Sequence, residues 1–210
     1  MLATVPVAQT GQMPAPPDEP FLEGVRFLRA ALQTLPKGRT ARVVLVVPVR
    51  DAPCAADLAR YLARSFAEAG KRAVFIPFGA GDGAGGPAGP GASDFLAGSS
   101  MRYGDVVAAD AWDRVEMVRP GDRPLADASP DRARDLLGQA SERAEPVIAF
   151  AGRDASSHER LLAALAANSD GVVLVADASQ AGVREVRDEA KEIDRHGGRV
   201  LGVALCRRRK

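Results

Sequence analysis

Short apolar runs alternate with amphipathic helical segments along most of this chain, and this alternation constrains its fold more than any other feature. The runs are nearly continuous in apolar residues, as expected of strands that are buried on both faces. They are Arg42–Val49, Ala73–Phe78, Arg114–Val118, Pro146–Ala151, Gly171–Ala176 and Arg199–Leu205. Strands that alternate with helices predict an α/β fold, here a doubly wound and mostly parallel sheet with helices on both faces. Ligands of such sheets bind at the carboxyl ends of the strands.

The helical segments between these runs have recognisable start and stop signals. Apolar residues recur at helical spacing, and proline, serine or glycine stands at several of the ends. The expected helices run from Pro20 to Leu35, from Ala56 to Ala69, from Pro130 to Arg143, from the capping box Ser156-x-x-Glu159 onward and from Ala181 to His196, with a short helical piece at Asp94–Gly98.

Residues 20–206 are expected to form a single domain of this kind. The leader, residues 1–19, is rich in proline and lacks a periodic apolar pattern, so we expect it to be disordered. The stretch 79–92 consists almost entirely of Gly, Ala and Pro, which predicts a flexible loop inside the domain. Residues 207–210 form a basic tail.

The charge balance and the cysteines exclude several classes of function. Lys+Arg number 28 and Asp+Glu 27, so no global field favours nucleic acid as a partner. Cys54 and Cys206 are far apart and lack metal-ligand spacing, so we expect neither a disulfide nor a zinc site, and a reducing compartment. His158 and His196 have no acidic or cysteine companions in the pattern, and no metal is expected. Without a secretory signal or a bilayer-spanning run, the protein is expected in the cytoplasm.

The loop after the strand Arg42–Val49 reads Pro53-Cys54-Ala55-Ala56-Asp57. A phosphate-binding loop at this place needs glycines for close approach of backbone N–H groups, a lysine that neutralises phosphate and a hydroxyl that holds Mg²⁺. Ala55 and Ala56 supply neither a charge nor a metal ligand, and Pro53 removes a backbone donor. The sequence therefore predicts that this loop does not bind ATP or Mg²⁺.

Several short motifs follow the leader in a fixed order: Glu23-x-x-Arg26-x-x-Arg29, RVVLVV, EAGKR at Glu68–Arg72, DFLAG at Asp94–Gly98, Val118-x-x-Gly121-x-x-Pro124, SDGVVLV at Ser169–Val175, and GGRVLGVAL near the end. These motifs and the order of elements resemble a known family, the cytoplasmic ATPase domain of the bacterial tyrosine kinases (BY-kinases) that regulate capsular and exopolysaccharide export. The resemblance implies a P-loop NTPase-like fold with its nucleotide site at the loop described above.

The chemistry of the family does not carry over to these positions. Aligned on EAGKR, the Gly-Lys-Ser-Thr of the family falls on Cys54, Ala55, Ala56 and Asp57. The acidic residue expected after the second strand falls on Pro77, and the Walker B aspartate falls on Phe150. Phosphoryl transfer depends on positioning and charge around Mg²⁺, so no residue remains to hold or activate a γ-phosphate. The closing CRRRK also has no counterpart of the tyrosine-rich tail that such kinases phosphorylate. We expect no catalytic residue and no cofactor.

Glu23, Arg26 and Arg29 survive from the family pattern, in which this motif lies at the contact between subunits of a ring. Spacings of three put the side chains at neighbouring positions of a helix surface. There they either pair with one another or present alternating charge to a second copy. The resemblance implies a homo-oligomer, and as partner a membrane polysaccharide co-polymerase (chain-length determinant) that would hold the protein at the inner membrane.

These observations predict a catalytically degenerate regulator or scaffold of exopolysaccharide biosynthesis and export. Two alternatives stay open. One is an active but divergent ATPase or tyrosine autokinase that holds phosphate with Arg50, Arg72 or Arg153. The other is a degenerate relative of the partitioning or positioning ATPases, which share the fold but usually lack the charged motif of the leading helix.

Overall fold

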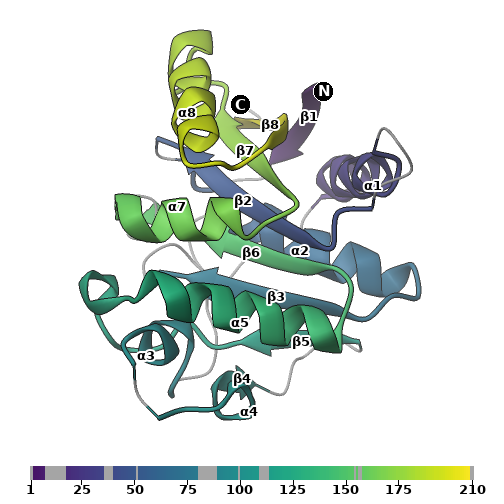
Figure 1. Ribbon diagram of the computed structural model, residues 1–210. Helices are drawn as coiled ribbons and strands as arrows, with labels where there is room; N and C mark the ends of the chain where they lie inside the picture. The colour runs from purple at the N-terminus through teal and green to yellow at the C-terminus, as the bar shows by residue number, and fades with distance from the viewer. Residues whose placement is uncertain are drawn as a thin grey trace.

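The computed structural model describes residues 2–7, 18–35, 40–50, 52–79, 89–98, 100–108, 114–153, 155 and 158–208. Its strands are β1 (Leu2–Val7), β2 (Val43–Val49), β3 (Ala73–Phe78), β4 (Val107–Ala108), β5 (Val115–Val118), β6 (Val147–Ala151), β7 (Gly171–Asp177) and β8 (Val200–Arg208). Its helices are α1 (Glu19–Gln33), α2 (Ala55–Glu68), α3 (Ala92–Leu96), α4 (Tyr103–Val106), α5 (Pro130–Arg143), α7 (Glu159–Ala167) and α8 (Val183–Arg195), with a 3₁₀ turn η2 (Leu125–Asp127). All six predicted strands are confirmed (Figure 1).

The described strands form one sheet in the order β1-β8-β7-β2-β6-β3-β5-β4. Every neighbouring pair is parallel except β4 with β5. All residues of β2 and β7 are buried, which explains why these strands read as continuous apolar runs. The expected doubly wound, mostly parallel α/β sheet is therefore confirmed.

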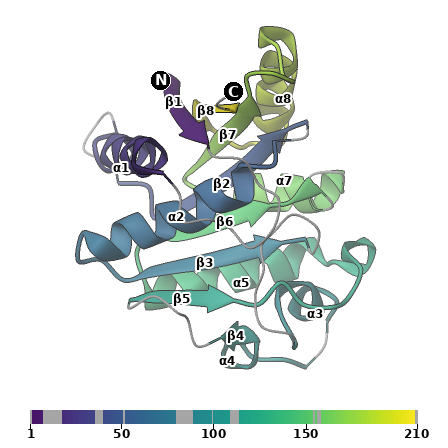
Figure 2. The same cartoon turned by 180° about the vertical axis from the view of Figure 1, so that it is seen from behind.

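Two layers of helices cover the sheet. Helices α1 and α2 lie on one face, and α3, α5, α7 and α8 lie on the other, as the two opposite views show (Figures 1 and 2). Alternate residues of each strand point to opposite faces. In β2, for example, Val44 and Val46 belong to the cluster under α1 and α2, whereas Leu45 and Val47 belong to the other cluster.

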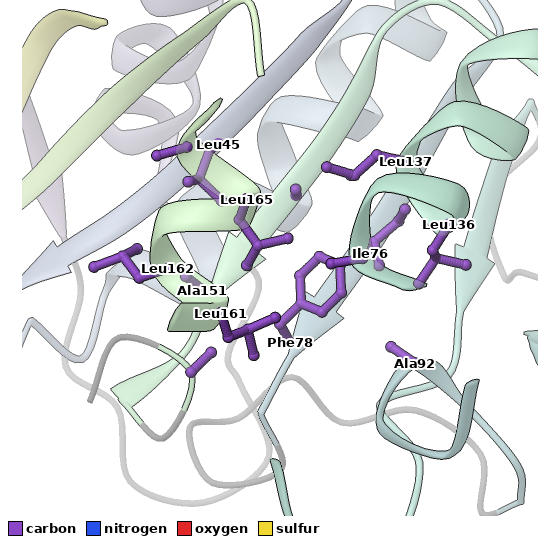
Figure 3. Close-up of a cluster of buried hydrophobic side chains, with 14 of the residues drawn as sticks. Leu45, Ile76, Phe78, Ala92, Leu136, Leu137, Ala151, Leu161, Leu162 and Leu165 are labelled. Carbon is purple, nitrogen blue, oxygen red and sulfur yellow. The ribbon is translucent and has the colours of Figure 1, made fainter. Parts of the chain in front are cut away.

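The larger core lies between the sheet and helices α5 and α7. Figure 3 shows Ile76 and Phe78 of β3 among Leu136 and Leu137 of α5 and Leu161 of α7. Each of these side chains is at most 2% exposed, so they exclude water from this side of the sheet. Close packing of these side chains holds the central strands in place, and with them the carboxyl ends of those strands.

Two of the motifs that carry the family resemblance meet on this side. The Asp94 carboxylate accepts hydrogen bonds from the backbone N–H groups of Gly91 and Asp122, each at 3.0 Å. Gly121 has φ +86°, and a Cβ there would lie 2.4 Å from Asp94 Oδ2. A side chain at this position would therefore displace the carboxylate, which gives the glycine and the aspartate a shared structural role.

The expected boundaries of the domain need correction at both ends. Leu2–Val7, predicted as part of a disordered leader, form β1 and pair in parallel with β8 over Val203 to Arg208. Residues 207 and 208, assigned to a basic tail, belong to β8. The two strands that pair here come from opposite ends of the chain, and such long-range pairing leaves no signal in the local sequence. The prediction of a disordered leader and a basic tail was wrong for residues 2–7 and 207–208 for this reason. Pro6 is tolerated because β1 lies at an edge of the sheet.

The predicted flexible loop, 79–92, lies mostly outside the described residues, since only Gly79 and residues 89–92 are described. Within the described part, Ala92 already begins α3. Among the described residues, no helix combines the length and apolar character that crossing a membrane requires.

Candidate functional site

The turn between β2 and α2 lies at the carboxyl edge of the sheet, where ligands of parallel α/β sheets bind. Cys54 is the N-cap residue of α2, and its side chain makes no capping hydrogen bond. The backbone N–H of Ala55 donates to the Ala52 carbonyl at 2.9 Å, so the turn closes on itself. This N–H group is therefore already used and does not point outward toward a ligand.

The side chains at the start of α2 are buried and apolar. Cys54, Ala55 and Ala56 are 3%, 0% and 4% exposed and belong to the cluster under α1 and α2. Asp57, the fourth position, is half-buried and lies 3.4 Å from the Arg60 guanidinium, measured from Oδ1 to Nη2. Burial raises the pKa of the Asp57 carboxyl, and Arg60 offsets part of that shift. The Asp57 carboxylate is thus paired within its own helix.

Pro77 and Phe150 occupy adjacent strands directly opposite each other. They are register partners in the parallel pair β3 and β6, and both are buried. The Phe150 ring belongs to the same apolar cluster as Ala55 and Ala56. An apolar ring and a proline, which offer no oxygen ligand, therefore stand where the resemblance expects carboxylates.

A disulfide bond joins Cys54 to Cys206, which corrects the expectation that these two cysteines stay unpaired. Cys54 lies at the start of α2 and Cys206 lies in β8, and β7 stands between β8 and β2 in the sheet. Sequence reasoning missed the pair because 152 residues separate the cysteines. The available signal was positional, because Cys54 follows the apolar run of β2, Cys206 follows the apolar run 199–205, and both runs lead to the same edge of a parallel sheet.

The three arginines proposed for phosphate binding do not converge. Arg50 follows β2 with φ 56°, and its guanidinium lies 3.6 Å from a Glu185 carboxylate oxygen of α8. Arg153 is exposed just after β6. Arg72 precedes β3 and therefore lies at the opposite, amino-terminal edge of the sheet. There it lines a cavity of about 470 Å³ together with Arg114 and Arg143.

The structure separates the three charges of the leading helix. Arg29 donates from Nη1 to the Ser65 carbonyl of α2 at 2.8 Å and is half-buried. Arg26 is exposed and donates from Nη1 to Glu19 at 2.6 Å, within the same helix. Glu23 is exposed. Arg29 is therefore an internal tie between α1 and α2, while Glu23 and Arg26 face outward.

An exposed aromatic residue accompanies these two charges. The Phe27 side chain is 58% exposed on α1. Glu23, Arg26, Phe27 and Ala30 are all exposed and follow the spacing of a single helix face. The sequence analysis identified the charged residues of this face but not Phe27, although its helical spacing from Glu23 and Arg26 could have indicated it.

His196 also differs from expectation, because it has acidic neighbours. Its Nε2 lies 3.1 Å from Glu192 Oε1. Together with Glu159 of α7, these side chains place three possible metal ligands within 4.8 Å of one another. Glu192 is one helical turn before His196, whereas Glu159 is close only in space. His158 is the N-cap residue of α7 and is not a member of this group.

No family model and no curated protein matches this chain. Solved structures do match it. The kinase domain of the Escherichia coli tyrosine kinase ETK has a TM-score of 0.78 at 20% identity, over 97% of this chain and 88% of that one. The BceF tyrosine kinase domain has a TM-score of 0.70 at 20% identity, over 89% and 77%. The VpsO kinase domain has a TM-score of 0.68 at 20% identity, over 87% and 93%. This chain therefore has the fold of the bacterial tyrosine kinase domains.

Proposed function

We propose that this protein is a BY-kinase-like regulator or scaffold of exopolysaccharide biosynthesis and export, which acts by binding and not by phosphoryl transfer. The observation that carries the proposal is the buried, apolar start of α2 at the carboxyl edge of the sheet. Cys54, Ala55 and Ala56 face the core, and Cys54 is bonded to Cys206. A phosphate needs donors and positive charge that point outward at this place.

The surroundings of the turn support the same conclusion. A magnesium ion bound with nucleotide needs carboxylate or hydroxyl oxygens around the phosphates. Pro77 and Phe150 supply none, and Asp57 is paired with Arg60. The alternative of an active, divergent kinase relied on Arg50, Arg72 or Arg153 to bind phosphate. Arg72 lies at the opposite edge of the sheet, which argues against that alternative.

The partner would be a membrane polysaccharide co-polymerase, with further copies of this chain in the same assembly. The resemblance of the motifs to BY-kinases suggests this partner, and the fold shared with tyrosine kinase domains is in keeping with it. The charged motif of α1, which the partitioning ATPases usually lack, favours the BY-kinase comparison over them. The exposed α1 face that carries Glu23, Arg26 and Phe27 offers charge and apolar surface for such a contact. Aromatic residues and arginine are enriched at protein interfaces.

Calorimetric titration with Mg·ATP and Mg·ADP tests the loss of nucleotide binding. The protein is titrated with the disulfide closed and again after reduction, since reduction removes the bond at Cys54. We expect no saturable heat in either state, which corresponds to a Kd weaker than about 1 mM. The ETK kinase domain in the same buffer serves as the positive control.

A low-micromolar Kd in either state, or release of phosphate from ATP above the buffer rate, would contradict the proposal. If nucleotide bound only to the reduced protein, the disulfide would be what blocks the nucleotide site. That result would also contradict the proposal that the protein works without nucleotide. A Kd of about 1 μM corresponds to about 8 kcal/mol of binding free energy, well above the detection limit of the experiment.

A further inference from the structure

Three metal-ligating side chains meet between α7 and α8, on the face of the sheet opposite α2. Glu192 and His196 are one turn apart at the carboxyl end of α8, so their side chains lie on the same side of that helix. Glu159 is the first residue of α7. One carboxylate oxygen of each glutamate and one ring nitrogen of the histidine all lie within 4.8 Å of one another.

The ring nitrogen in this group has no hydrogen-bond partner. His196 Nε2 is shielded from solvent and makes no hydrogen bond, although Glu192 Oε1 lies 3.1 Å away. The His196 side chain is only 14% exposed. A buried polar atom without a partner costs free energy, which a ligand bound at that atom would recover.

The two carboxylates have unequal surroundings. Glu192 Oε2 forms an ion pair with Arg195, which leaves Oε1 directed toward His196. Glu159 is exposed. Two carboxylates this close together repel each other, and a cation between them would remove that repulsion.

Helix α8 has few other contacts that fix it on the sheet. Ile193 is its only fully buried residue, and Val186 and Ala190 are partly buried against the core. Val183, at its first turn, is 69% exposed. A bond between the end of α8 and the start of α7 would therefore add a link where apolar packing is sparse.

We propose that Glu159, Glu192 and His196 bind a divalent transition-metal ion, with Zn²⁺ as the best fit, and that the ion links α7 to α8. One imidazole with two carboxylates is a donor set that Zn²⁺ accepts, whereas Mg²⁺ and Ca²⁺ favour oxygen ligands alone. Two ligands at positions i and i+4 of one helix form a recurrent half-site for zinc. The third ligand, from a different helix, makes the ion a cross-link. Three protein ligands leave one coordination position for water.

Calorimetry with ZnCl₂ tests this site directly. The protein is untagged, treated with EDTA and dialysed, and its disulfide is kept closed so that Cys54 and Cys206 cannot bind the ion. We expect one site per chain with a micromolar Kd, and no heat with MgCl₂ at the same concentrations. His196→Ala and Glu159→Gln should each weaken binding at least tenfold. Glu159 is exposed, so its variant is expected to fold even if the histidine variant does not.

Asp188→Asn is the matched control on α8. Asp188 lies 3.8 Å from Arg184 and 3.6 Å from Lys191 and is outside the cluster. This variant should bind Zn²⁺ as the unmodified protein does. At a Zn²⁺ concentration close to the Kd of the unmodified protein, the Tm of that protein and of the control should rise, and the Tm of Glu159→Gln should rise much less. Absent heat, or equal affinity in Glu159→Gln and Asp188→Asn, would overturn the proposal. No step involves nucleotide or co-polymerase, so this result is independent of the proposed function.

Discussion

Arg29 connects two helices of the same layer, because its guanidinium donates to the Ser65 carbonyl of α2, whereas Arg26 pairs with Glu19 inside α1. The two arginines belong to one sequence motif but lie in different environments. Hydrogen bonds from charged groups in partly buried sites contribute more to stability than exposed ion pairs do. A shared motif therefore does not imply a shared role.

At this scale we predict that Arg29→Ala lowers the free energy of unfolding by about 1–2 kcal/mol, because it removes a charge-assisted hydrogen bond between helices. Arg26→Ala should change it by less than about 0.5 kcal/mol, because the Glu19 pair is exposed. Urea unfolding followed by circular dichroism measures both. Equal destabilisation of the two variants would contradict the separation of their roles.

The start of α2 shows the same dependence on neighbours. Ala55 and Ala56 are apolar in any fold, but the chain alone does not reveal that they are buried against the Phe150 cluster. His196 was predicted to lack acidic companions, and Glu159 reaches it only because α7 and α8 lie on one face. Contacts of this kind depend on tertiary packing, which short-range spacing does not report.

At the scale of elements, the disulfide between α2 and β8 should be a major source of stability. Cross-linking residues 152 positions apart restricts the unfolded chain, and the chain-entropy model gives an upper value of about 5 kcal/mol for a loop of this size. We expect reduction to lower stability by about 2–5 kcal/mol. Thermal unfolding with and without dithiothreitol measures the change.

Cys206→Ala is the control for this prediction, because it lacks the bond in both buffers. Its Tm should not respond to dithiothreitol. It should equal the Tm of the reduced unmodified protein, apart from the small loss of stability that removal of one buried sulfur atom causes. A Tm of the unmodified protein that does not move on full reduction, checked by thiol titration, would show that the bond contributes no stability.

The exposed face of α1 is the second element with a testable role. Phe27→Asp should weaken self-association or binding to the co-polymerase cytoplasmic segment at least tenfold, because interface aromatic residues carry much of the binding energy. The folded monomer should change in stability by less than about 0.5 kcal/mol, since Phe27 is 58% exposed. Light scattering and calorimetry measure the complex, and urea unfolding measures the monomer.

Val183→Asp is the matched control for Phe27→Asp. Val183 is also a large exposed apolar residue, at 69%, but it lies on α8 and over the opposite face of the sheet. This variant should associate as the unmodified protein does. Equal masses and affinities for all three proteins would leave α1 without a role in assembly.

At the scale of the whole molecule, the two ends of the chain meet in one edge of the sheet. Strand β1 pairs in parallel with β8, so residues at opposite ends of the sequence share backbone hydrogen bonds (Figure 1). We predict that deletion of residues 1–7 exposes β8 as a new edge. An unprotected edge strand pairs readily with other chains, so the truncated protein should lose stability and aggregate more readily.

Hydrogen exchange of the backbone amides in residues 203–208 measures this effect. Protection there should fall on deletion, while protection in β2 should persist because β2 lies in the middle of the sheet. Unchanged exchange in residues 203–208 together with unchanged solubility would indicate that β1 does not protect this edge.

The sequence by itself determined the type of fold and the position of its central elements. Strands β2, β3, β6 and β7 are buried on both faces. Such strands can be recognised in the sequence as apolar runs, because every residue contacts the core. Helices α2 and α5 can be predicted from the sequence because their apolar residues recur with the helical period. The sequence also determined which residue types stand at the start of α2.

Only the tertiary structure decided which distant residues meet. It paired β1 with β8, bonded Cys54 to Cys206, opposed Pro77 to Phe150, and brought Glu159 to His196. The physical reason is common to these cases. Periodicity and capping signals are local, whereas strand order, sulfur proximity and ligand clusters depend on how whole elements pack around a shared core.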